Sequence, residues 1–363
     1  MENSVKPVIE GKRILVIGGT GSLGRALVAR LLGGGIGVPA KVIVFSRDEA
    51  KQHAMRVQYS GSGAGRVASG PGPGRLELRL GDVRRFDDVA AAVRDADLVI
   101  NAAGLKQVPS CEYFPEQALL TNCLGPVNIV RAIRETGTAV KVVVGVSTDK
   151  ACQPVNVMGM TKAVHERVFA AANLSCPATR FVLTRYGNVL GSRGSVIPLF
   201  CQQIRQGGPV TVTAPEMTRF LMSLDQAVDC VLAALGWGGP GEVIVPRIPS
   251  ATMLNVVKAL VGQRNVEIRI TGPRPGEKVH EVLICEQEAA RTVRRGDYYA
   301  IRPLLPELYQ PGGDEPVALQ GPYSSAHGLL SLDQTRQLLD QHRMLPEQWE
   351  RSEGENLFSR LAA

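Results

Sequence analysis

Short apolar runs alternate with longer amphipathic stretches through the first half of this chain of 363 residues. The runs are rich in β-branched residues and lie at residues 13–18, 41–46, 76–80, 97–103, 140–147 and 181–187. Between them, apolar residues recur at helical spacing over residues 22–32, 85–94, 115–136 and 157–173. Strands that alternate with helices are typical of a parallel sheet covered by helices, so this half of the chain is predicted to be a doubly wound α/β domain.

The alternation weakens after about residue 190, where shorter elements and turn-rich segments take over. We therefore predict a nucleotide-binding domain over residues 11–190, to which some later segments return. A smaller, partly interwoven C-terminal substrate-binding lobe is expected over residues 191–345, and a tail over residues 346–363. Two stretches rich in Gly, Ser and Pro, at 33–40 and 60–74, are predicted to be surface loops without chemistry.

The first apolar run leads directly into the glycine-rich segment "GGTGSLG", which opens an amphipathic helix. A helix N-terminus with glycines lets backbone N–H groups approach a pyrophosphate, and the helix dipole favours the negative charge. In this strand–turn–helix setting the segment predicts a Rossmann-type dinucleotide site. Its expected cofactor-binding residues are Gly18, Thr20, Gly21, Ser22, Leu23 and Gly24.

The second run ends in "VFSRDEAK", where an NAD-binding chain would place an acidic residue at the tip of the strand. Ser46 and Arg47, with Lys51, suit a 2′-phosphate, so NADP is predicted in preference to NAD. Asp48 is either a displaced ribose ligand or the start of the next helix.

The third and fourth runs end in segments that fit the same cofactor. In "GDVRR", Asp82 and Val83 stand where the adenine ring is expected. In "NAAG", the small residues Ala102, Ala103 and Gly104 allow close approach of the cofactor.

Composition and charge narrow the function classes. The chain is 44% hydrophobic and carries a net charge of +7, but its 41 basic residues are interleaved with 34 acidic ones. This distribution does not favour nucleic acid, and a nucleotide diphosphate substrate explains the charge equally well. No apolar run approaches the roughly 20 residues of a membrane span, and the N-terminus lacks the apolar core of a secretion signal, so the cytoplasm is the expected location.

The cysteines and histidines indicate neither disulfides nor a metal site. Seven cysteines are scattered without a CxxC pair, which favours reduced thiols. The five histidines show no metal-ligand spacing. Cys152 is a conceivable nucleophile, although thiols in such positions are usually packing residues.

Residues 147–162, "STDKACQPVNVMGMTK", look like the chemical centre of a nucleotide-dependent enzyme. Chains built in this way usually place a tyrosine four residues before the final lysine, Lys162, to move a proton while a hydride moves. Here that position is Met158, whose thioether carries no acidic proton and accepts hydrogen bonds only weakly. The proton must therefore travel through other groups if the chain is an enzyme of this kind.

Eight motifs together resemble one family, the extended short-chain dehydrogenase/reductases that are inverting UDP-N-acetylglucosamine 4,6-dehydratases. They are "GGTGSLG", "SRDE", "GDVR", "LKQVPSCEYFP", "STDKACQPVN", "RYGNVLGSRGSVIPLF", "MTRF" and "RPGEK", in that order. The resemblance covers about residues 11–300, and "PYSS" with the following helix extends it to about 342. "STDK" followed by "RYGNVLGSRGSV" separates this group from sugar epimerases and dTDP-glucose dehydratases.

The resemblance implies a redox-neutral reaction. A hydride leaves carbon 4 of the sugar for NADP, water is eliminated across carbons 5 and 6, and the hydride returns to carbon 6 while carbon 5 is protonated with inversion. Lys150 would be the base at carbon 5, which requires a partly neutral amine. Asp149, with a raised pKa, would protonate the departing 6-hydroxyl.

The same resemblance gives roles to the neighbouring residues. Thr148 holds the hydroxyl position of the usual triad, and Lys162 would bind the nicotinamide ribose. Since the family contains active members with methionine, Met158 is interpreted as a variant, and the carbon-4 proton is expected to pass through Thr148 or a water to Asp149 or Lys150. The implied substrate-binding residues, for the diphosphate and uridine in particular, are Lys106, Asn188, Arg193, Ser195, Arg219, Arg274 and Glu277.

Other functions stay open at this stage. A 5,6-dehydratase that stops at the alkene, or a 4-epimerase, would share the same motifs. A non-catalytic NADP-binding protein is a further alternative, although it would have no physical need for Asp149 and Lys150. A homo-oligomer, either a dimer or a hexamer, is expected, with helices 115–136 and 157–173 as the pair through which such folds dimerise.

Overall fold

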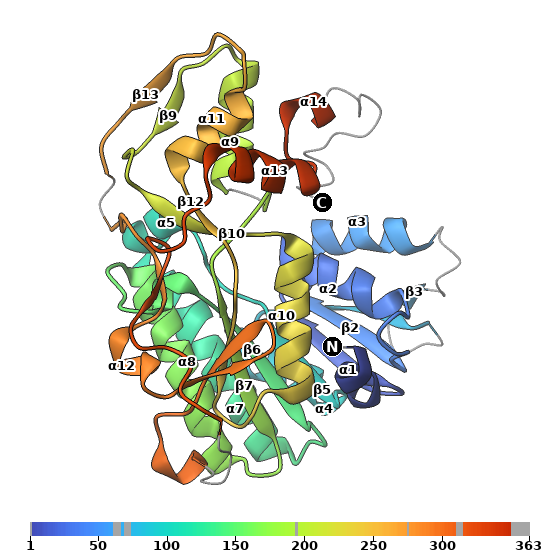
Figure 1. Ribbon diagram of the computed structural model, residues 1–363. Helices are drawn as coiled ribbons and strands as arrows, with labels where there is room; N and C mark the ends of the chain where they lie inside the picture. The colour runs from blue at the N-terminus through green and yellow to red at the C-terminus, as the bar shows by residue number, and fades with distance from the viewer. Residues whose placement is uncertain are drawn as a thin grey trace.

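The fold is built around one ten-stranded sheet (Figure 1). The computed structural model describes residues 2–60, 67–68, 74–192, 195–273, 276–309 and 315–349. The order of the strands in the sheet is β15 (Thr292–Arg295), β16 (Tyr298–Ile301), β11 (Val243–Pro246), β7 (Arg180–Tyr186), β6 (Val142–Thr148), β5 (Leu98–Asn101), β1 (Arg13–Ile17), β2 (Lys41–Ser46), β4 (Leu76–Leu80) and β3 (Val67–Ala68).

The strands from β11 to β3 are parallel. Strand β16 pairs antiparallel with β11, and the edge strand β15 pairs antiparallel with β16, so β16 alone runs against the other strands of this sheet. Ile14 in β1 pairs with Val42 on one side and with Leu98 on the other. The strand order reverses at this point, where doubly wound sheets bind their ligands. The six predicted strands and the Rossmann-type α/β class are confirmed.

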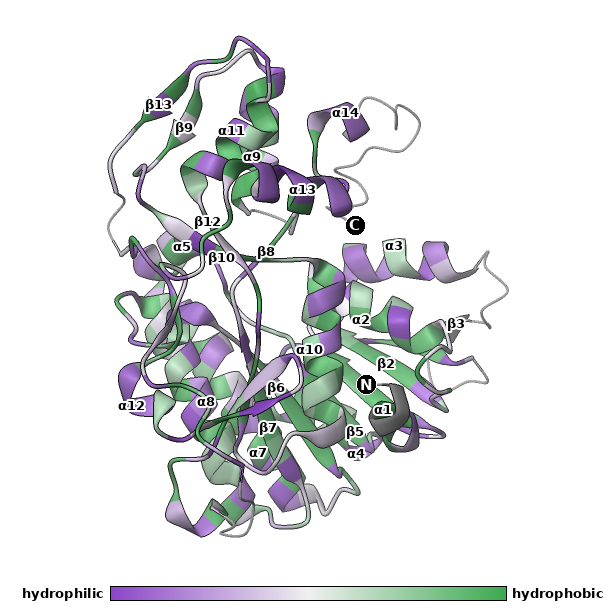
Figure 2. Cartoon of the chain, viewed as in Figure 1, coloured by the Kyte–Doolittle hydropathy of each residue, from purple (hydrophilic) through white to green (hydrophobic). Residues whose placement is uncertain are grey.

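Helices cover both faces of the sheet. The helices α1 (Glu2–Ile9), α2 (Ser22–Leu32) and α10 (Leu224–Trp237) pack together on one face, and α4 (Phe86–Arg94), α7 (Gly125–Thr136) and α8 (Val157–Ser175) on the other. Figure 2 shows the sheet strands as predominantly hydrophobic, as expected for strands buried on both sides.

The predicted helix over residues 115–136 is interrupted. It consists of α6 (Pro115–Leu119), a π-helical turn η1 (Leu120–Leu124) and α7. Pro126 lies in the first turn of α7 and has no N–H to donate to the carbonyl four residues earlier. The backbone hydrogen bonds change from the α-helical to the π-helical pattern just before this proline. The other three predicted helices correspond to α2, α4 and α8, and residues 33–40 form the expected loop. The loop predicted at 60–74 lies largely outside the described residues.

A second hydrophobic cluster lies apart from the main core, drawn above the sheet in Figure 1. It includes Phe200, Leu260 and Leu339. The elements that contribute are α9 (Val196–Arg205), β9 (Val210–Val212), α11 (Met253–Val261), β13 (Ile268–Ile270) and α13 (Leu332–Gln341). A small sheet of β12 (Ser250–Thr252), β10 (Thr218–Met222) and β8 (Asn188–Val189) joins this lobe to the main domain.

The second lobe is interwoven with the first because β11, β15 and β16 return to the large sheet. The exact domain boundaries stay predictions. The remaining described elements are α3 (Glu49–Ser60), α5 (Val108–Tyr113), η2 (Asp149–Ala151), β14 (Val282–Ile284), α12 (Glu286–Ala289), η3 (Pro306–Leu308), β17 (Tyr323–Ser324) and α14 (Pro346–Trp349). Among the helices of the described ranges, none combines the length and apolar character needed to cross a membrane.

Candidate active site

A cavity of about 1010 Å³ lies where the carboxyl ends of β1, β5 and β6 face the second lobe. Its volume is at the upper end of the range of small-molecule sites. Most of the predicted site residues line it. From the cofactor set these are Gly18, Thr20, Gly21, Ser22, Leu23, Gly24, Lys51, Ala102, Ala103 and Gly104; from the catalytic set Thr148, Asp149, Lys150, Met158 and Lys162; and from the substrate set Lys106, Asn188, Ser195, Arg219 and Glu277.

The turn between β1 and α2 has room only for glycine at two positions. Gly18 has a φ of +79°, and a Cβ there would lie 2.7 Å from the backbone nitrogen of Ala103. A Cβ on Gly24 would lie 2.5 Å from the carbonyl oxygen of Gly18. The N-terminus of α2 has no side-chain cap, so its N–H groups are available to a phosphate. This geometry fits a dinucleotide.

The tip of β2 is ordered by short side-chain contacts. The Thr20 hydroxyl donates to Ser46 Oγ at 2.9 Å. Asp48 Oδ1 accepts from the backbone N–H of Lys51 at 3.0 Å, and its other oxygen pairs with the Lys51 ammonium. Of the two interpretations of Asp48, the start of a helix is the one observed, because this bond caps α3.

The end of β4 carries a charged cluster beside the cavity. Arg47 NH1 lies 3.7 Å from Asp82 Oδ2, and Arg84 Nε donates to the same oxygen at 2.8 Å. Burial alone would raise the pKa of Asp82, but the hydrogen bonds from Arg84 and the charge of Arg47 lower it overall. The Val83 side chain is buried against Gly125. Four predicted cofactor-binding residues do not line the cavity and lie beside it: Ser46, Arg47, Asp82 and Val83.

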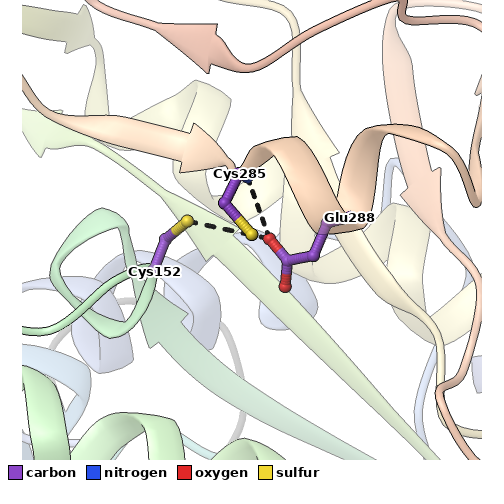
Figure 3. A group of neighbouring side chains, drawn as sticks. All are labelled: Cys152, Cys285 and Glu288. Carbon is purple, nitrogen blue, oxygen red and sulfur yellow. Dashed lines mark hydrogen bonds between the residues drawn. The ribbon is translucent and has the colours of Figure 1, made fainter.

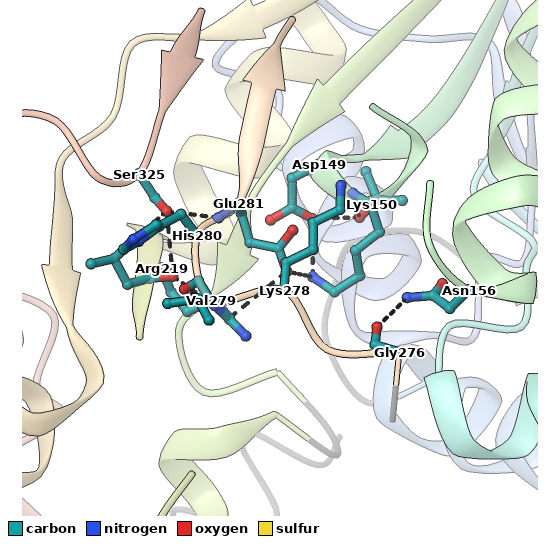
Figure 4. Close-up of polar contacts among 12 residues, drawn as sticks. Asp149, Lys150, Asn156, Arg219, Gly276, Lys278, Val279, His280, Glu281 and Ser325 are labelled. Carbon is teal, nitrogen blue, oxygen red and sulfur yellow. Dashed lines mark hydrogen bonds and ion pairs between the residues drawn. The ribbon is translucent and has the colours of Figure 1, made fainter. Parts of the chain in front are cut away.

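A continuous chain of polar contacts begins where β6 ends. The Thr148 hydroxyl donates to Asp149 Oδ1 at 2.8 Å, and Lys150 Nζ donates to the same oxygen at 3.1 Å. Lys150 Nζ also lies 3.3 Å from Glu281 Oε1 (Figure 4). Asp149 and Glu281 are each only 1% exposed, whereas the Lys150 side chain is 22% exposed. The two carboxylates are therefore shielded from solvent, which strengthens their interaction with the Lys150 ammonium.

Arg219 extends the network on the far side of Glu281. Its Nε lies 3.8 Å from Glu281 Oε1, and its NH1 donates to the carbonyl oxygens of Thr218 and Val279 at 2.7 and 3.2 Å. Two carboxylates thus face two cations in the buried cluster formed by Asp149, Lys150, Arg219 and Glu281.

The pKa of Lys150 is raised above its ordinary value, which contradicts the expected, partly neutral amine. Burial acts to lower this pKa, but the charges of Asp149 and Glu281 outweigh both burial and the opposing charge of Arg219. The sequence did not indicate Glu281 as a neighbour of Lys150, and its carboxylate is one of the two charges that raise this pKa.

Four buried oxygens of cavity-lining residues have no hydrogen-bond partner in the described part of the chain. They are Asp149 Oδ2, Glu281 Oε2, Asn188 Oδ1 and Ser195 Oγ. Buried polar atoms are normally paired, because an unpaired one costs free energy. These four oxygens are therefore suited to groups of a bound ligand.

Lys162 and Met158 lie on α8, one turn apart. Lys162 Nζ donates to the carbonyl oxygen of Val146 at 2.5 Å and lies 2.7 Å from His165 Nδ1. Burial lowers the pKa of Lys162 to about 8, and burial together with the Lys162 charge holds the pKa of His165 well below its usual range. The uncharged imidazole of His165 can then accept a hydrogen bond from Lys162.

Met158 is 3% exposed and packs with Cys111 and Ala118 at the cavity wall. Next to Met158, the start of α8 packs closely against the turn η2. Asn156 Oδ1 accepts from the Gly159 N–H at 2.8 Å, and a Cβ on Gly159 would collide with the Lys150 carbonyl. The methionine therefore fills space and offers no proton to the site.

Comparisons with known proteins identify the family. The model of the family described as "Polysaccharide biosynthesis protein" matches residues 14–303. The chain belongs to this family. A curated relative named UDP-glucose 4-epimerase, from Rickettsia bellii (strain OSU 85-389), is 41% identical over 338 residues, which are 90% of this chain and 95% of the relative. A protein of the same name from Rickettsia canadensis (strain McKiel) is 42% identical over 339 residues, with the same shares covered.

Solved structures agree with this assignment. The X-ray structure of Pen from Bacillus thuringiensis has a TM-score of 0.83 and 31% identity, and the match covers 93% of this chain and 99% of that one. The dTDP-glucose 4,6-dehydratase DesIV from Streptomyces venezuelae, with NAD and TYD bound, has a TM-score of 0.62 and 22% identity over 74% of this chain and 86% of its own, and supports the fold alone. The predicted extended short-chain dehydrogenase/reductase fold of the polysaccharide-biosynthesis type is confirmed.

Three buried residues at or near the site were not among the residues predicted from the sequence. Glu281 directly precedes the apolar strand β14, and His165 lies on the buried face of α8. Asn122 lies in the π-helical turn, where its Oδ1 accepts from the Leu105 N–H at 2.8 Å. No pattern in the sequence singles out His165 or Asn122, because the buried residues around them include other polar ones, such as Glu166 on α8 and Thr121 in η1. The predicted ligands Arg193 and Arg274 lie outside the described residues.

Proposed function

We propose that this protein dehydrates UDP-N-acetylglucosamine to a UDP-2-acetamido-2,6-dideoxy-4-keto-hexose, with inversion at carbon 5 and NADP as an internally recycled hydride carrier. The contact chain from Thr148 through Asp149 and Lys150 to Glu281 carries this proposal. It combines an acid, an amine and a second carboxylate at the carboxyl edge of the sheet, beside the glycine-rich turn.

Dehydration fits this set better than epimerisation does. Inverting carbon 4 requires a hydride to leave and return and one group to carry the hydroxyl proton. Eliminating water across carbons 5 and 6 needs in addition a base at carbon 5 and an acid at the 6-hydroxyl. The chain supplies an adjacent Asp149 and Lys150 for these steps, while the usual carrier at carbon 4 is replaced by Met158.

The cofactor proposal rests on the turn after β1 and the tip of β2. The absence of side chains at Gly18 and Gly24 supports binding of a pyrophosphate in this turn, and Lys162 would bind a ribose hydroxyl. At the tip of β2, Asp48 is engaged in capping α3, so Ser46, Arg47 and Lys51 favour a 2′-phosphate. A bound nicotinamide nucleotide would supply the hydride acceptor and donor.

The proton steps follow from the contacts. The Thr148 hydroxyl passes the carbon-4 hydroxyl proton to Asp149, whose Oδ1 it already contacts. Asp149 then protonates the 6-hydroxyl as it leaves, so one proton serves both steps. Lys150 removes the carbon-5 proton, and it does so only in the minor population of molecules in which its amine is neutral. Glu281 keeps that population small.

The substrate proposal uses the residues that face the second lobe. Asn188 and Ser195 have unpartnered buried oxygens, and Arg219 brings a cation to the same cavity. These groups suit the uridine and the diphosphate. Lys106 and Glu277 line the cavity as well, and Arg193 and Arg274 stay predicted phosphate ligands.

The proposal is tested by incubating the purified protein with UDP-N-acetylglucosamine, with no cofactor added, and following the sugar by mass spectrometry and proton NMR. We expect loss of one water and a 4-keto, 6-methyl product inverted at carbon 5. A Lys150→Met variant should retain bound nucleotide and form no product.

Other products would select the alternatives. A change of configuration at carbon 4 alone, with this sugar or with UDP-glucose, would favour the 4-epimerase activity named in the Rickettsia relatives. An alkene without a methyl group would indicate a 5,6-dehydratase. An unchanged sugar with NADP supplied would contradict the dehydratase.

A further inference from the structure

Two cysteines meet beside the catalytic cluster. Cys152 directly follows the turn η2 that carries Lys150, and Cys285 directly follows β14, which Glu281 precedes. Their sulfur atoms and a Glu288 carboxylate oxygen all lie within 4.8 Å of one another (Figure 3). Two segments far apart in sequence thus bring a pair of thiols together next to the turn that carries Lys150.

The two thiols differ in access and in proton affinity. Cys152 is 3% exposed, whereas Cys285 is partly exposed. The Cys152 thiol donates a hydrogen bond to Glu288 Oε2 at 3.7 Å, beside the Cys285 sulfur. The neighbouring Cys152 thiol lowers the pKa of Cys285 to about 7, while the proximity of Cys285 and burial raise the pKa of Cys152. The Cys285 sulfur also accepts the backbone N–H of Glu288. Cys285 is therefore the thiolate that a reagent meets first, and Cys152 is the buried thiol behind it.

A metal ion suits this cluster less well than thiol chemistry does. Two sulfurs and a carboxylate are possible zinc ligands. However, Arg185 NH1 donates to Glu288 Oε2 at 2.7 Å and Arg185 NH2 donates to Oε1 at 3.0 Å. The guanidinium engages both oxygens and places a positive charge where a cation would bind.

We propose that Cys152 and Cys285 are an oxidisable dithiol, which a peroxide converts to a disulfide beside the active site. The Cys285 thiolate attacks a peroxide oxygen, the O–O bond breaks, and the expelled oxygen leaves as water or alcohol after taking a proton from solvent. Cys152 then attacks the resulting sulfenic sulfur and expels hydroxide, which leaves as water with the Cys152 proton. The two thiols lose two electrons, and the peroxide gains them.

The disulfide should alter the catalytic turn. An S–S bond is about 2.05 Å long, so the two sulfurs must approach through rotation of their side chains or movement of the segments that carry them. The Cys152 carbonyl accepts a hydrogen bond from Lys278 Nζ at 2.6 Å, and Lys150 stands two residues before Cys152. We expect oxidation to displace Lys150 from Glu281 and lower turnover. This expectation for turnover, unlike the thiol chemistry, rests on the proposed function.

The experiment treats the full-length protein with hydrogen peroxide, alkylates the remaining thiols and maps the peptides by mass spectrometry. We expect a linked Cys152–Cys285 peptide that disappears after reduction. Cys285→Ser should abolish the link. Cys123→Ser, which changes the other partly exposed cysteine, should leave it unchanged. In Cys152→Ala, the sulfenic acid should persist on Cys285 and react with dimedone.

Two results would overturn the dithiol. The first is that both thiols can still be alkylated after peroxide treatment. The second is that the purified protein holds stoichiometric zinc that protects them. Turnover of UDP-N-acetylglucosamine, followed in parallel, should fall as the disulfide forms and return on reduction. A linked peptide in a protein that never turns over this sugar would support the dithiol and contradict the proposed function.

Discussion

Glu281 alters the pKa of Lys150, the residue that was predicted to be the base. Its carboxylate lies 3.3 Å from Lys150 Nζ and raises the pKa of that amine together with Asp149. An amine acts as a base only when it is neutral, so the rate should rise with pH toward the Lys150 pKa. The sequence indicated Asp149 and Lys150 because they are adjacent in a motif. It did not indicate Glu281, which meets them only in the fold.

Replacing Glu281 by glutamine tests this electrostatic role. Removing one negative charge should lower the pKa of Lys150, so the rising limb of the pH–rate profile should shift to lower pH by about one to two pKa units. The measurement is the initial rate of product formation across pH, with Glu286→Gln on α12 as a control for loss of a carboxylate. An unchanged limb, or a shift to higher pH, would show that Glu281 does not control the base.

Thr148 carries the second residue-scale prediction. Thr148→Val keeps the shape of the side chain but removes the hydroxyl that donates to Asp149. Hydride transfer should fall by about 100-fold or more, while Thr148→Ser should retain most of the rate. The measurement is the single-turnover absorbance of the reduced nicotinamide. Met158→Tyr should change the rate little, and full activity in Thr148→Val would exclude the threonine route.

At the scale of elements, α8 links the turn η2, which carries Asp149 and Lys150, to the part of the cavity beside the glycine-rich turn. Its first turn is held by Asn156 and packs on the Lys150 carbonyl at Gly159, and one turn later Lys162 contacts His165. Gly145 in β6 makes room for this packing, since a Cβ there would lie 2.9 Å from His165 Nε2. The helix therefore positions Lys162 through contacts with β6.

His165 makes the stability of the fold depend on pH. The pKa of this buried imidazole lies well below the 6.5 of a free histidine, so the unfolded chain binds a proton that the folded chain excludes. Its contribution is fully present above pH 6.5 and is lost progressively as the pH falls below that value. His165→Gln should reduce the loss of unfolding free energy between pH 7 and pH 5 by about 1–2 kcal/mol.

Urea unfolding at the two pH values measures this difference. His53→Gln serves as the control, because His53 is exposed and should not alter the slope. Equal losses of stability in the wild type and in His165→Gln would contradict the inferred depression of the pKa.

The elements were predictable to different degrees for physical reasons. The strands and helices of the first half were predictable because their buried positions recur regularly along the sequence as apolar residues. In β1, for example, Ile14, Leu15 and Val16 are fully buried. The π-helical turn at Leu120–Leu124 depends on local backbone hydrogen bonding around Pro126, which apolar periodicity does not encode. The cofactor turn was predictable because strand, glycines and helix are contiguous, whereas the His165–Lys162 contact also depends on β6.

At the scale of the molecule, an apolar surface on the helical face suggests how two chains associate. The exposed apolar residues are Leu120, Leu124, Val127, Met160 and Val164, in η1, α7 and α8. The helices α7 and α8 pack against each other, so these side chains extend over neighbouring elements. A surface of this kind is suited to an interface between copies of the chain, so the predicted homo-oligomer, a dimer or a hexamer, is expected to form through it.

We expect the wild type to be at least dimeric and the combined variant Met160→Lys and Val164→Lys to be monomeric, because both lysines would be desolvated at the interface. Sedimentation velocity measures the change. Val57→Lys, at an exposed apolar position on α3, is the control and should remain dimeric. A monomeric wild type, or a double variant that still dimerises, would show that these helices are not the interface.

The proposed hydride and proton steps take place together in the cavity beside the second lobe, and the path of the hydride tests this proposal most directly. The measurement is the conversion of UDP-N-acetylglucosamine deuterated at carbon 4, with no external reductant, and location of the deuterium in the product by NMR. The account predicts that the label moves to the new methyl group at carbon 6 of the 4-keto product. Deuterium returned to carbon 4 of a sugar that has lost no water would contradict dehydration and establish epimerisation.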